Sequence, residues 1–312
     1  MNKTFGLIGG DRRQAELARL LKEKGNTVWT YGVPGLPDAL DQAAAADVVI
    51  LPLPLCREEG MLNCEAAALP TAALFRRFRP DQLLLAGQVR PAQQMEAEQR
   101  GLTIVDYFQR EDLNVANAAA TAEAALQTAM EHLDRTLLDM NCLILGFGRI
   151  GRLLAFRLHG LGANVTAAAR RPADLAWIRA YGWRSAEISR LGGRLGAFGA
   201  VFNTVPSLVL DRPLLMQLPK NCLCVELAST PGIDQEAAEK LGLPCIWARS
   251  LPGRLVPATA AAAICDAVFY IIKERGDPEW EKNGSDLPCA APSAPISRCW
   301  GSWRSWYSSM KQ

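Results

Sequence analysis

The sequence predicts an α/β protein built from two doubly wound parallel sheets that are joined by long helices. Short apolar segments alternate with helical patterns along most of the 312 residues, which is typical of parallel sheets covered by helices on both faces. A chain of this length can form two domains, each with its own core. An alanine-rich helical stretch separates the two sets of segments, so we place the division there.

The first domain, residues 1–115, contains five candidate strands. They are Lys3–Gly10, Thr27–Gly32, Asp47–Pro52, Gln82–Gly87 and Leu102–Phe108. A helix begins at Asp11 directly after the first strand. Arg12 and Arg13 lie in its first turn beside free backbone donors, which favours an anionic ligand on the substrate side of the protein. The alternative is a solvated first turn.

The helical stretch from Asn114 to Met140 is alanine-rich, and we assign residues 116–140 as a hinge between the domains. Thr121 and Glu123 interrupt its small residues near the N-terminal end. They either form a solvated face or point into the cleft between the domains, and the sequence leaves both interpretations open.

The motif on which the functional argument depends follows this hinge. An apolar run, Cys142–Leu145, leads into Gly146-Phe147-Gly148-Arg149-Ile150-Gly151, and a helical pattern and a second strand at Asn164–Ala169 complete a βαβ unit. In such a unit the glycines permit a tight turn, leave room for a pyrophosphate and let the helix pack close to its strand. We therefore expect these six residues to bind a dinucleotide at the helix N-terminus; a purely structural turn is the alternative.

The end of that second strand indicates which dinucleotide binds. NAD sites usually place Asp or Glu there to accept hydrogen bonds from the ribose 2′-hydroxyl, whereas this chain has Arg170 and Arg171. Paired guanidinium groups can hold a 2′-phosphate, so NADP is favoured. The alternative is that one arginine lies on the solvated start of the next helix.

The second domain, residues 141–256, continues with four further strands. They are Trp183–Ser185, Ala200–Pro206, Cys222–Ser229 and Pro244–Ser250. Loops that follow two of these strands should line the coenzyme crevice. The residues concerned are Thr204, Val205, Pro206, Ala228 and Ser229. A last helix, Pro257 to Glu274 within the segment 257–275, is long enough to return to the first domain, and residues 276–312 form an irregular tail rich in proline, serine and tryptophan.

Composition excludes several classes of function. The net charge of +2 gives no reason to expect nucleic acid as a partner, and no apolar run is long enough for a membrane helix. With only two histidines and no CxxC pair among nine cysteines, we expect buried thiols and no metal site. Without a signal peptide pattern, we expect a cytoplasmic protein.

Several motifs together resemble the family of bacterial dipicolinate synthase A subunits. They are Gly9-Gly10-Asp11-Arg12-Arg13-Gln14, the turn from Leu145 to Gly151, Asn203-Thr204-Val205-Pro206-Ser207, Glu226-Leu227-Ala228-Ser229, and the segments Leu251-Pro252-Gly253 and Pro257-Ala258-Thr259-Ala260. The resemblance runs from about residue 3 to 274. Thr230, Ala258 and Ala124 depart from it, since Arg, Lys and Gly are usual there.

The resemblance implies two Rossmann-like domains arranged as in 2-hydroxyacid dehydrogenases. It also implies a protein of the mother cell during sporulation, an NADP-linked oxidation of a dihydrodipicolinate-type dicarboxylate to dipicolinate, and a hetero-oligomer with a flavoprotein-like second subunit. Arg12, Arg13, Thr121 and Arg254 are then candidates for substrate binding.

Candidate proton acceptors are Glu123 and His132 on the hinge helix and Asp11, which could instead orient Arg13. Two other functions remain open. One is an NADP-dependent 2-hydroxyacid dehydrogenase, and the other is a regulatory subunit that binds NADP without catalysis.

Overall fold

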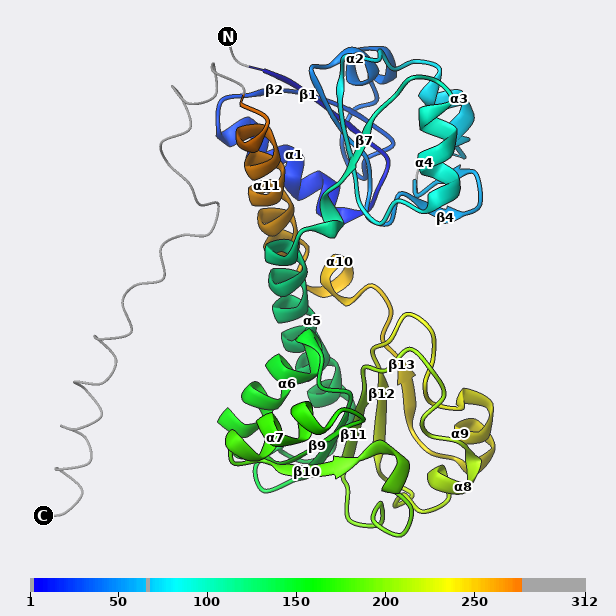
Figure 1. Cartoon of the computed structure of the whole chain (residues 1–312), viewed down its shortest axis with the longest axis vertical. Coiled ribbons are helices and arrows are strands. Elements are labelled where there is room, and N and C mark those ends of the chain that lie inside the picture. Colours follow the sequence, from blue (N-terminus) through cyan, green and yellow to red (C-terminus); the bar gives the residue numbers. More distant parts are fainter. Residues whose placement is uncertain (1–2, 66–67, 277–312) are drawn as a thin grey trace, which may run out of the picture.

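The computed structural model describes residues 3–65 and 68–276. Figure 1 shows two lobes with two long helices, α5 (Glu111–His132) and α11 (Pro257–Glu274), along the axis that joins them. Within these residues, no helix is long and apolar enough to cross a membrane. All but the first residue of the predicted irregular tail, 276–312, lies outside the described residues.

The N-terminal lobe is built around a parallel sheet with the strand order β2-β1-β3-β6-β7. Its strands are β1 (Thr4–Ile8), β2 (Thr27–Tyr31), β3 (Val48–Ile50), β6 (Leu83–Ala86) and β7 (Ile104–Asp106). Each lies inside a segment predicted from the sequence. Because β2 lies on one side of β1 and β3 on the other, the connections diverge between β1 and β3, which is where doubly wound sheets bind ligands.

Side chains alternate along these strands and supply apolar residues to both faces of the sheet. Phe5 and Leu7 pack in a core with α1 and α11, whereas Ile8 packs in a core with α2, α3 and α4. The helices are α1 (Arg12–Glu23), α2 (Leu40–Ala45), α3 (Thr71–Phe75) and α4 (Pro91–Glu98), with a 3-10 helix at Tyr107–Gln109. A small antiparallel hairpin, β4 (Cys56–Glu58) and β5 (Met61–Leu62), follows β3 and was not predicted.

The second lobe contains a parallel sheet with the strand order β10-β9-β8-β11-β12-β13. Its strands are β8 (Asn141–Leu145), β9 (Asn164–Ala169), β10 (Arg184–Glu187), β11 (Ala200–Asn203), β12 (Leu223–Glu226) and β13 (Cys245–Trp247). Its helices are α6 (Arg149–Gly160), α7 (Pro172–Ala180), α8 (Arg212–Leu215) and α9 (Gln235–Leu241), with a 3-10 helix at Ile188–Arg190 and α10 (Leu251–Leu255) leading to α11. The connections diverge between β8 and β11, as in a dinucleotide-binding sheet.

One helix differs from its prediction. The sequence predicts Asn114 to Met140, whereas α5 begins at Glu111 and ends at His132. The backbone is extended at Leu133, and Asp139 has a φ of 58°, because the chain must reverse before β8 begins. The spacing of alanines indicates which face of the helix is buried, but it contains no signal for this reversal. The predicted helix from Pro257 to Glu274 is confirmed.

Candidate functional site

The glycine turn lies between β8 and α6, where the connections of the second sheet diverge. Gly146 has a φ of 95°, and a Cβ there would lie 2.4 Å from Oγ1 of Thr204. A Cβ on Gly151 would lie 2.2 Å from the carbonyl oxygen of Gly146, so the helix can pack against the turn only with glycine there. A Cβ on Gly148 would meet no described atom within 4 Å. The turn therefore leaves open space at the N-terminus of α6, as a pyrophosphate requires.

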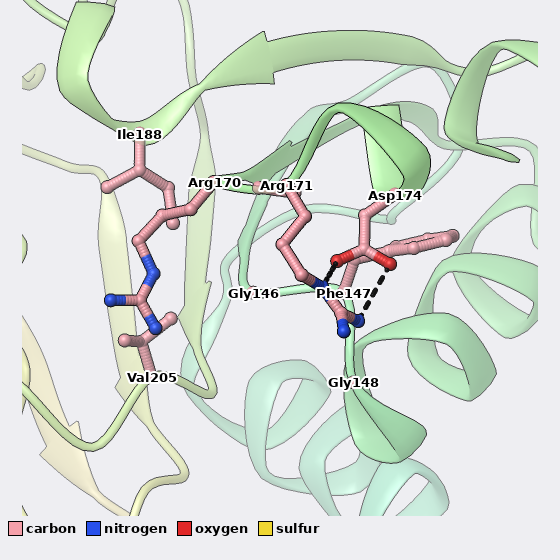
Figure 2. Close-up of a pocket in the computed structure, with 9 residues that line it drawn as sticks. Gly146, Phe147, Gly148, Arg170, Arg171, Asp174, Ile188 and Val205 are labelled. Atoms are coloured by element: carbon pink, nitrogen blue, oxygen red, sulfur yellow. Dashed lines mark hydrogen bonds and ion pairs between the residues drawn. The ribbon is translucent and has the colours of Figure 1, made fainter. Parts of the chain in front are cut away.

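A pocket of about 300 Å³ adjoins this turn, and we call it the glycine-turn pocket. Figure 2 shows its lining residues. They are Gly146, Phe147, Gly148, Ala169, Arg170, Arg171, Asp174, Ile188 and Val205. Six of these were predicted to bind the coenzyme from the sequence alone.

The two arginines at the end of β9 do not form the pair that the sequence predicts. Arg170 extends toward Ile188 and Val205, whereas Arg171 turns toward Asp174 (Figure 2). Nε and Nη2 of Arg171 donate hydrogen bonds to Asp174 over 2.8 Å and 3.1 Å. Arg170 has no ion-pair partner within residues 3–65 and 68–276. Arg170 is thus the side chain of the two that is free to meet an anion.

Asp174 is a carboxylate that the sequence analysis did not single out. It is 7% exposed and also accepts a hydrogen bond from Nη2 of Arg152, over 3.2 Å. Hydrogen bonds from Arg171 lower the pKa of Asp174, against the opposing effect of partial burial, so the carboxyl is ionised at neutral pH. Two guanidinium groups neutralise this charge, which leaves the pocket without the unpaired carboxylate of a typical NAD site.

The loops after β11 and β12 are held by a buried carboxylate. Glu226 is 0% exposed and accepts hydrogen bonds from the amide of Asn203 over 2.8 Å and 2.9 Å. The backbone N–H groups of Ala228, Gly232 and Ile233 donate to the same carboxylate over 2.8 to 3.0 Å. This network fixes the backbone next to the pocket, because a buried carboxylate needs all of these donors.

The remaining residues predicted for the coenzyme do not line the pocket. Thr204 donates its hydroxyl to the carbonyl oxygen of Leu145 over 2.8 Å, and Nε of Arg149 donates to Glu111 over 2.9 Å. The others are Ile150, Gly151, Pro206, Ala228 and Ser229. Arg149 therefore joins the start of α6 to the start of α5.

A second, larger cavity of about 740 Å³ lies where the connections of the N-terminal sheet diverge, and we call it the arginine cleft. It is lined by Asp11, Arg12, Arg13, Pro54, Cys56, Arg57, Asn63, Glu65, Gln88, Arg90, Arg249, Ser250, Gly253 and Arg254. The residues up to Arg90 belong to the N-terminal lobe, and those from Arg249 onward follow β13 and enter α10. Six arginines face two carboxylates here, so the cleft carries excess positive charge.

Both carboxylates of the cleft are already paired. Nη2 of Arg13 lies 2.8 Å from Oδ2 of Asp11, and Nη2 of Arg57 lies 3.0 Å from Glu65. Arg13 also donates to the carbonyl oxygen of Leu53 over 2.5 Å, which fixes α1 to the loop after β3. The other four arginines, Arg12, Arg90, Arg249 and Arg254, have no carboxylate partner among the described residues.

Asp11 acts as the N-cap of α1 and as the orienting partner of Arg13. Burial raises the pKa of Asp11, but the hydrogen bonds and charge of Arg13 outweigh it, and the pKa lies below its usual value. Such a carboxylate is a weak base. Of the two roles considered for Asp11, the geometry favours the orientation of Arg13.

Two of the predicted proton acceptors, Glu123 and His132, line neither of the two pockets. Glu123 is exposed on α5 and pairs with Arg157 on α6 over 2.7 Å. His132 is exposed at the end of α5, where its Nδ1 lies 2.8 Å from the carbonyl oxygen of Thr128. Thr121 is buried and donates to the carbonyl oxygen of Asn117, and it lines neither pocket.

Sequence reasoning missed Arg57, Arg90 and Arg249 as members of the cleft. Arg57 lies on the unpredicted hairpin, and Arg90 lies just before α4. The available signal was position, because each follows a predicted strand at its carboxyl end. Arg249 lay inside the predicted strand Pro244–Ser250, whereas the observed strand, β13, ends at Trp247 and leaves Arg249 in the loop that follows.

Comparisons with known proteins agree with this architecture. A family model for the N-terminal domain of the dipicolinate synthase A subunit matches residues 4–108. The A subunit of dipicolinate synthase from Bacillus subtilis (strain 168) is 28% identical over 285 residues, which cover 86% of this chain and 96% of the relative. The similarity therefore extends through both lobes.

Solved structures extend the same comparison. The crystal structure of the dipicolinate synthase A subunit from Bacillus halodurans has a TM-score of 0.77 and 27% identity, and the match covers 88% of this chain and 98% of that chain. D-lactate dehydrogenase from Escherichia coli has a TM-score of 0.56 at 11% identity, over 88% of this chain and 97% of that chain. This second match concerns the fold alone, and it confirms the predicted arrangement of two Rossmann-like domains as in 2-hydroxyacid dehydrogenases.

Proposed function

This chain belongs to the family of dipicolinate synthase A subunits, and from that membership we propose that it oxidises dihydrodipicolinate, or its hydrated precursor, to dipicolinate with NADP. The observation that carries the proposal is the arginine cleft. Its four arginines without a carboxylate partner among the described residues suit a small ligand with two carboxylates, because guanidinium groups bind carboxylates through charge-assisted hydrogen bonds.

The glycine-turn pocket is the proposed coenzyme site. Open space at Gly148 and the N-terminus of α6 fit a pyrophosphate. Arg170 is the proposed partner of the 2′-phosphate, since Arg171 is paired with Asp174. NADP, when bound, supplies the acceptor for a hydride from the substrate ring.

For this oxidation the chain has to orient the substrate ring more than it has to supply an acid or a base. Oxidation of a dihydropyridine removes a hydride and a proton and yields an aromatic ring, so the reaction has a large intrinsic driving force. Among the described residues, the cleft contains no unpaired carboxylate, and neither histidine lines it. Its arginines would hold the two carboxylates so that the ring lies in one orientation, which is the contribution of proximity.

The same observation weighs against a 2-hydroxyacid dehydrogenase. That reaction moves a hydroxyl proton and uses a general base in the cleft. The lack of such a base among the described residues of the cleft favours a second candidate function. In it, the chain binds NADP and the dicarboxylate but completes its active site only with another protein. The relatives are described as one subunit of dipicolinate synthase, and we infer that a flavoprotein-like second subunit is the partner.

The test is to mix the purified chain with NADP and freshly made dihydrodipicolinate and to follow the absorbance of the reduced nicotinamide. We expect reduction with the chain alone and no reduction when a saturating amount of dipicolinate is present. Reduction only after the second subunit is added supports the second candidate. Binding of NADPH without any reduction, with or without that subunit, contradicts the proposed oxidation.

A further inference from the structure

Arg249 lines the arginine cleft from a different lobe than Arg12 and Arg13, which were predicted from the sequence at the start of α1. It follows β13 and precedes α10, so it extends from the sheet that carries the glycine turn. Arg12, Arg13, Arg57 and Arg90 come instead from the N-terminal lobe. The cleft thus receives cations from both sheets.

The guanidinium of Arg249 is oriented by an aromatic ring. Its Cζ atom lies 3.3 Å from the centroid of the Trp247 ring, a stacked cation–π contact. Stacking occupies one face of the planar group and leaves its in-plane N–H donors free. Because Arg249 has no carboxylate partner among the described residues, these donors remain available to a ligand.

Trp247 is itself held in place by the end of the neighbouring strand. Its Nε1 donates to the carbonyl oxygen of Ala228 over 3.1 Å, and the N–H of Ala228 donates to Glu226 over 2.8 Å. The N–H of Ala248 donates to the backbone carbonyl of Glu226 over 2.9 Å. The stack therefore rests on the buried network that also fixes the loops beside the glycine-turn pocket, which limits the side-chain entropy lost when Arg249 binds a ligand.

We propose that Arg249 binds the second carboxylate of the substrate from the side of the coenzyme domain, while Arg12 holds the first from the start of α1. The inference rests on the proposed function, because it assumes a dicarboxylate in the arginine cleft. Arg249 is then a specificity residue. A ligand with two carboxylates can bind Arg12 and Arg249 at the same time, whereas a monocarboxylate leaves one of these two arginines without a carboxylate.

The experiment measures binding by calorimetry, with no turnover required. The ligands are pyridine-2,6-dicarboxylate and pyridine-2-carboxylate, and the proteins are the full chain and its variants Arg249→Ala, Arg249→Lys and Arg212→Ala. Arg212 is an exposed arginine of the same lobe that lines neither of the two pockets, so it controls for the loss of one positive charge.

The full chain should bind the dicarboxylate more tightly than the monocarboxylate. Arg249→Ala should weaken the dicarboxylate by about 10- to 30-fold, the size of one charge-assisted hydrogen-bonded contact, and change the monocarboxylate by less than about 3-fold. Arg249→Lys should restore only part of the loss, because an ammonium keeps the charge without the planar fork or the stack. Arg212→Ala should match the full chain.

Equal losses for both ligands, or no loss, would overturn the role of Arg249. This outcome is separate from a failure of the proposed function, which is measured by reduction of NADP in the full chain. A Trp247→Phe variant provides a second test, because it keeps an aromatic face but removes the hydrogen bond to Ala228. It should weaken the dicarboxylate less than Arg249→Ala does, and a larger loss from Trp247→Phe would also count against the inference.

Discussion

Replacing Arg170 by alanine should weaken NADPH binding and leave NADH binding unchanged. In the glycine-turn pocket Arg170 lacks an ion-pair partner among the described residues, whereas Arg171 donates twice to Asp174. A guanidinium–phosphate contact contributes about 1.5 to 3 kcal/mol, and the exposure of Arg170 favours the lower end. A loss of about 1.5 to 2 kcal/mol corresponds to roughly 10- to 30-fold in Kd for NADPH.

The assay is a parallel titration of NADPH and NADH, followed by calorimetry or by the fluorescence of the reduced nicotinamide. Arg184→Ala is the matched control, since Arg184 is an exposed arginine of the same lobe that does not line the pocket. It should leave both affinities unchanged. An equal loss of NADPH and NADH affinity in Arg170→Ala, or an unchanged preference between them, would refute the assignment of the 2′-phosphate to this side chain.

Three further predictions concern the cleft and the buried carboxylates. Arg12→Ala should raise the KM for dihydrodipicolinate about 10-fold with little change in stability, whereas Arg13→Ala should lower the unfolding free energy by about 1 to 3 kcal/mol because it removes the buried partner of Asp11. Initial rates measure the first effect and urea unfolding measures the second. If the two variants changed the KM and the unfolding free energy to the same extent, the separate roles of Arg12 and Arg13 would be contradicted. Glu226→Ala should cost about 3 kcal/mol or more in urea unfolding, since Asn203 and three backbone donors lose their acceptor, and a loss below about 1 kcal/mol would show that the network is dispensable. Asp11→Asn should destabilise the protein at neutral pH, because the pKa of Asp11 is lowered in the folded protein and its carboxylate therefore stabilises the fold fully above the unfolded pKa of about 3.9. This stabilisation is lost as the pH falls through the folded pKa, so the unfolding curves of the unmodified protein and the variant should converge only in acid. A difference in stability that disappears near neutral pH would be incompatible with the lowered pKa.

Much of the fold follows from local patterns. The five strands of the first sheet lie inside the predicted segments, and the three at its centre, β1, β3 and β6, are short buried apolar runs bounded by turn residues. The glycine turn was predictable because two of its requirements are local: Gly146 has a φ of 95°, and a Cβ on Gly151 would lie 2.2 Å from the carbonyl oxygen of Gly146. The end of α5 was not, because the reversal at Asp139 depends on where β8 must begin.

The sites depend on contacts between distant residues, and these were predicted only in part. Arg171 was expected to face a phosphate, but Asp174, in the first turn of the next helix, takes its guanidinium. Arg249 is far from Arg12 in sequence, and only the strand order and the path of α10 bring both to one cavity. The spacing of apolar residues along a helix or strand predicts which of its faces is buried. It does not predict which loops of the two lobes lie next to each other.

The proposed function requires that the ring of a dicarboxylate bound by this chain gives its hydride to NADP. The measurement uses dihydrodipicolinate labelled with deuterium at every saturated ring carbon, so that whichever carbon gives the hydride carries the label, followed by NMR of the coenzyme after the reaction. We expect NADPH that carries deuterium at C4 of the nicotinamide, in an amount equal to the dipicolinate formed. Dipicolinate that accumulates without NADPH, or NADPH without the label, would contradict it.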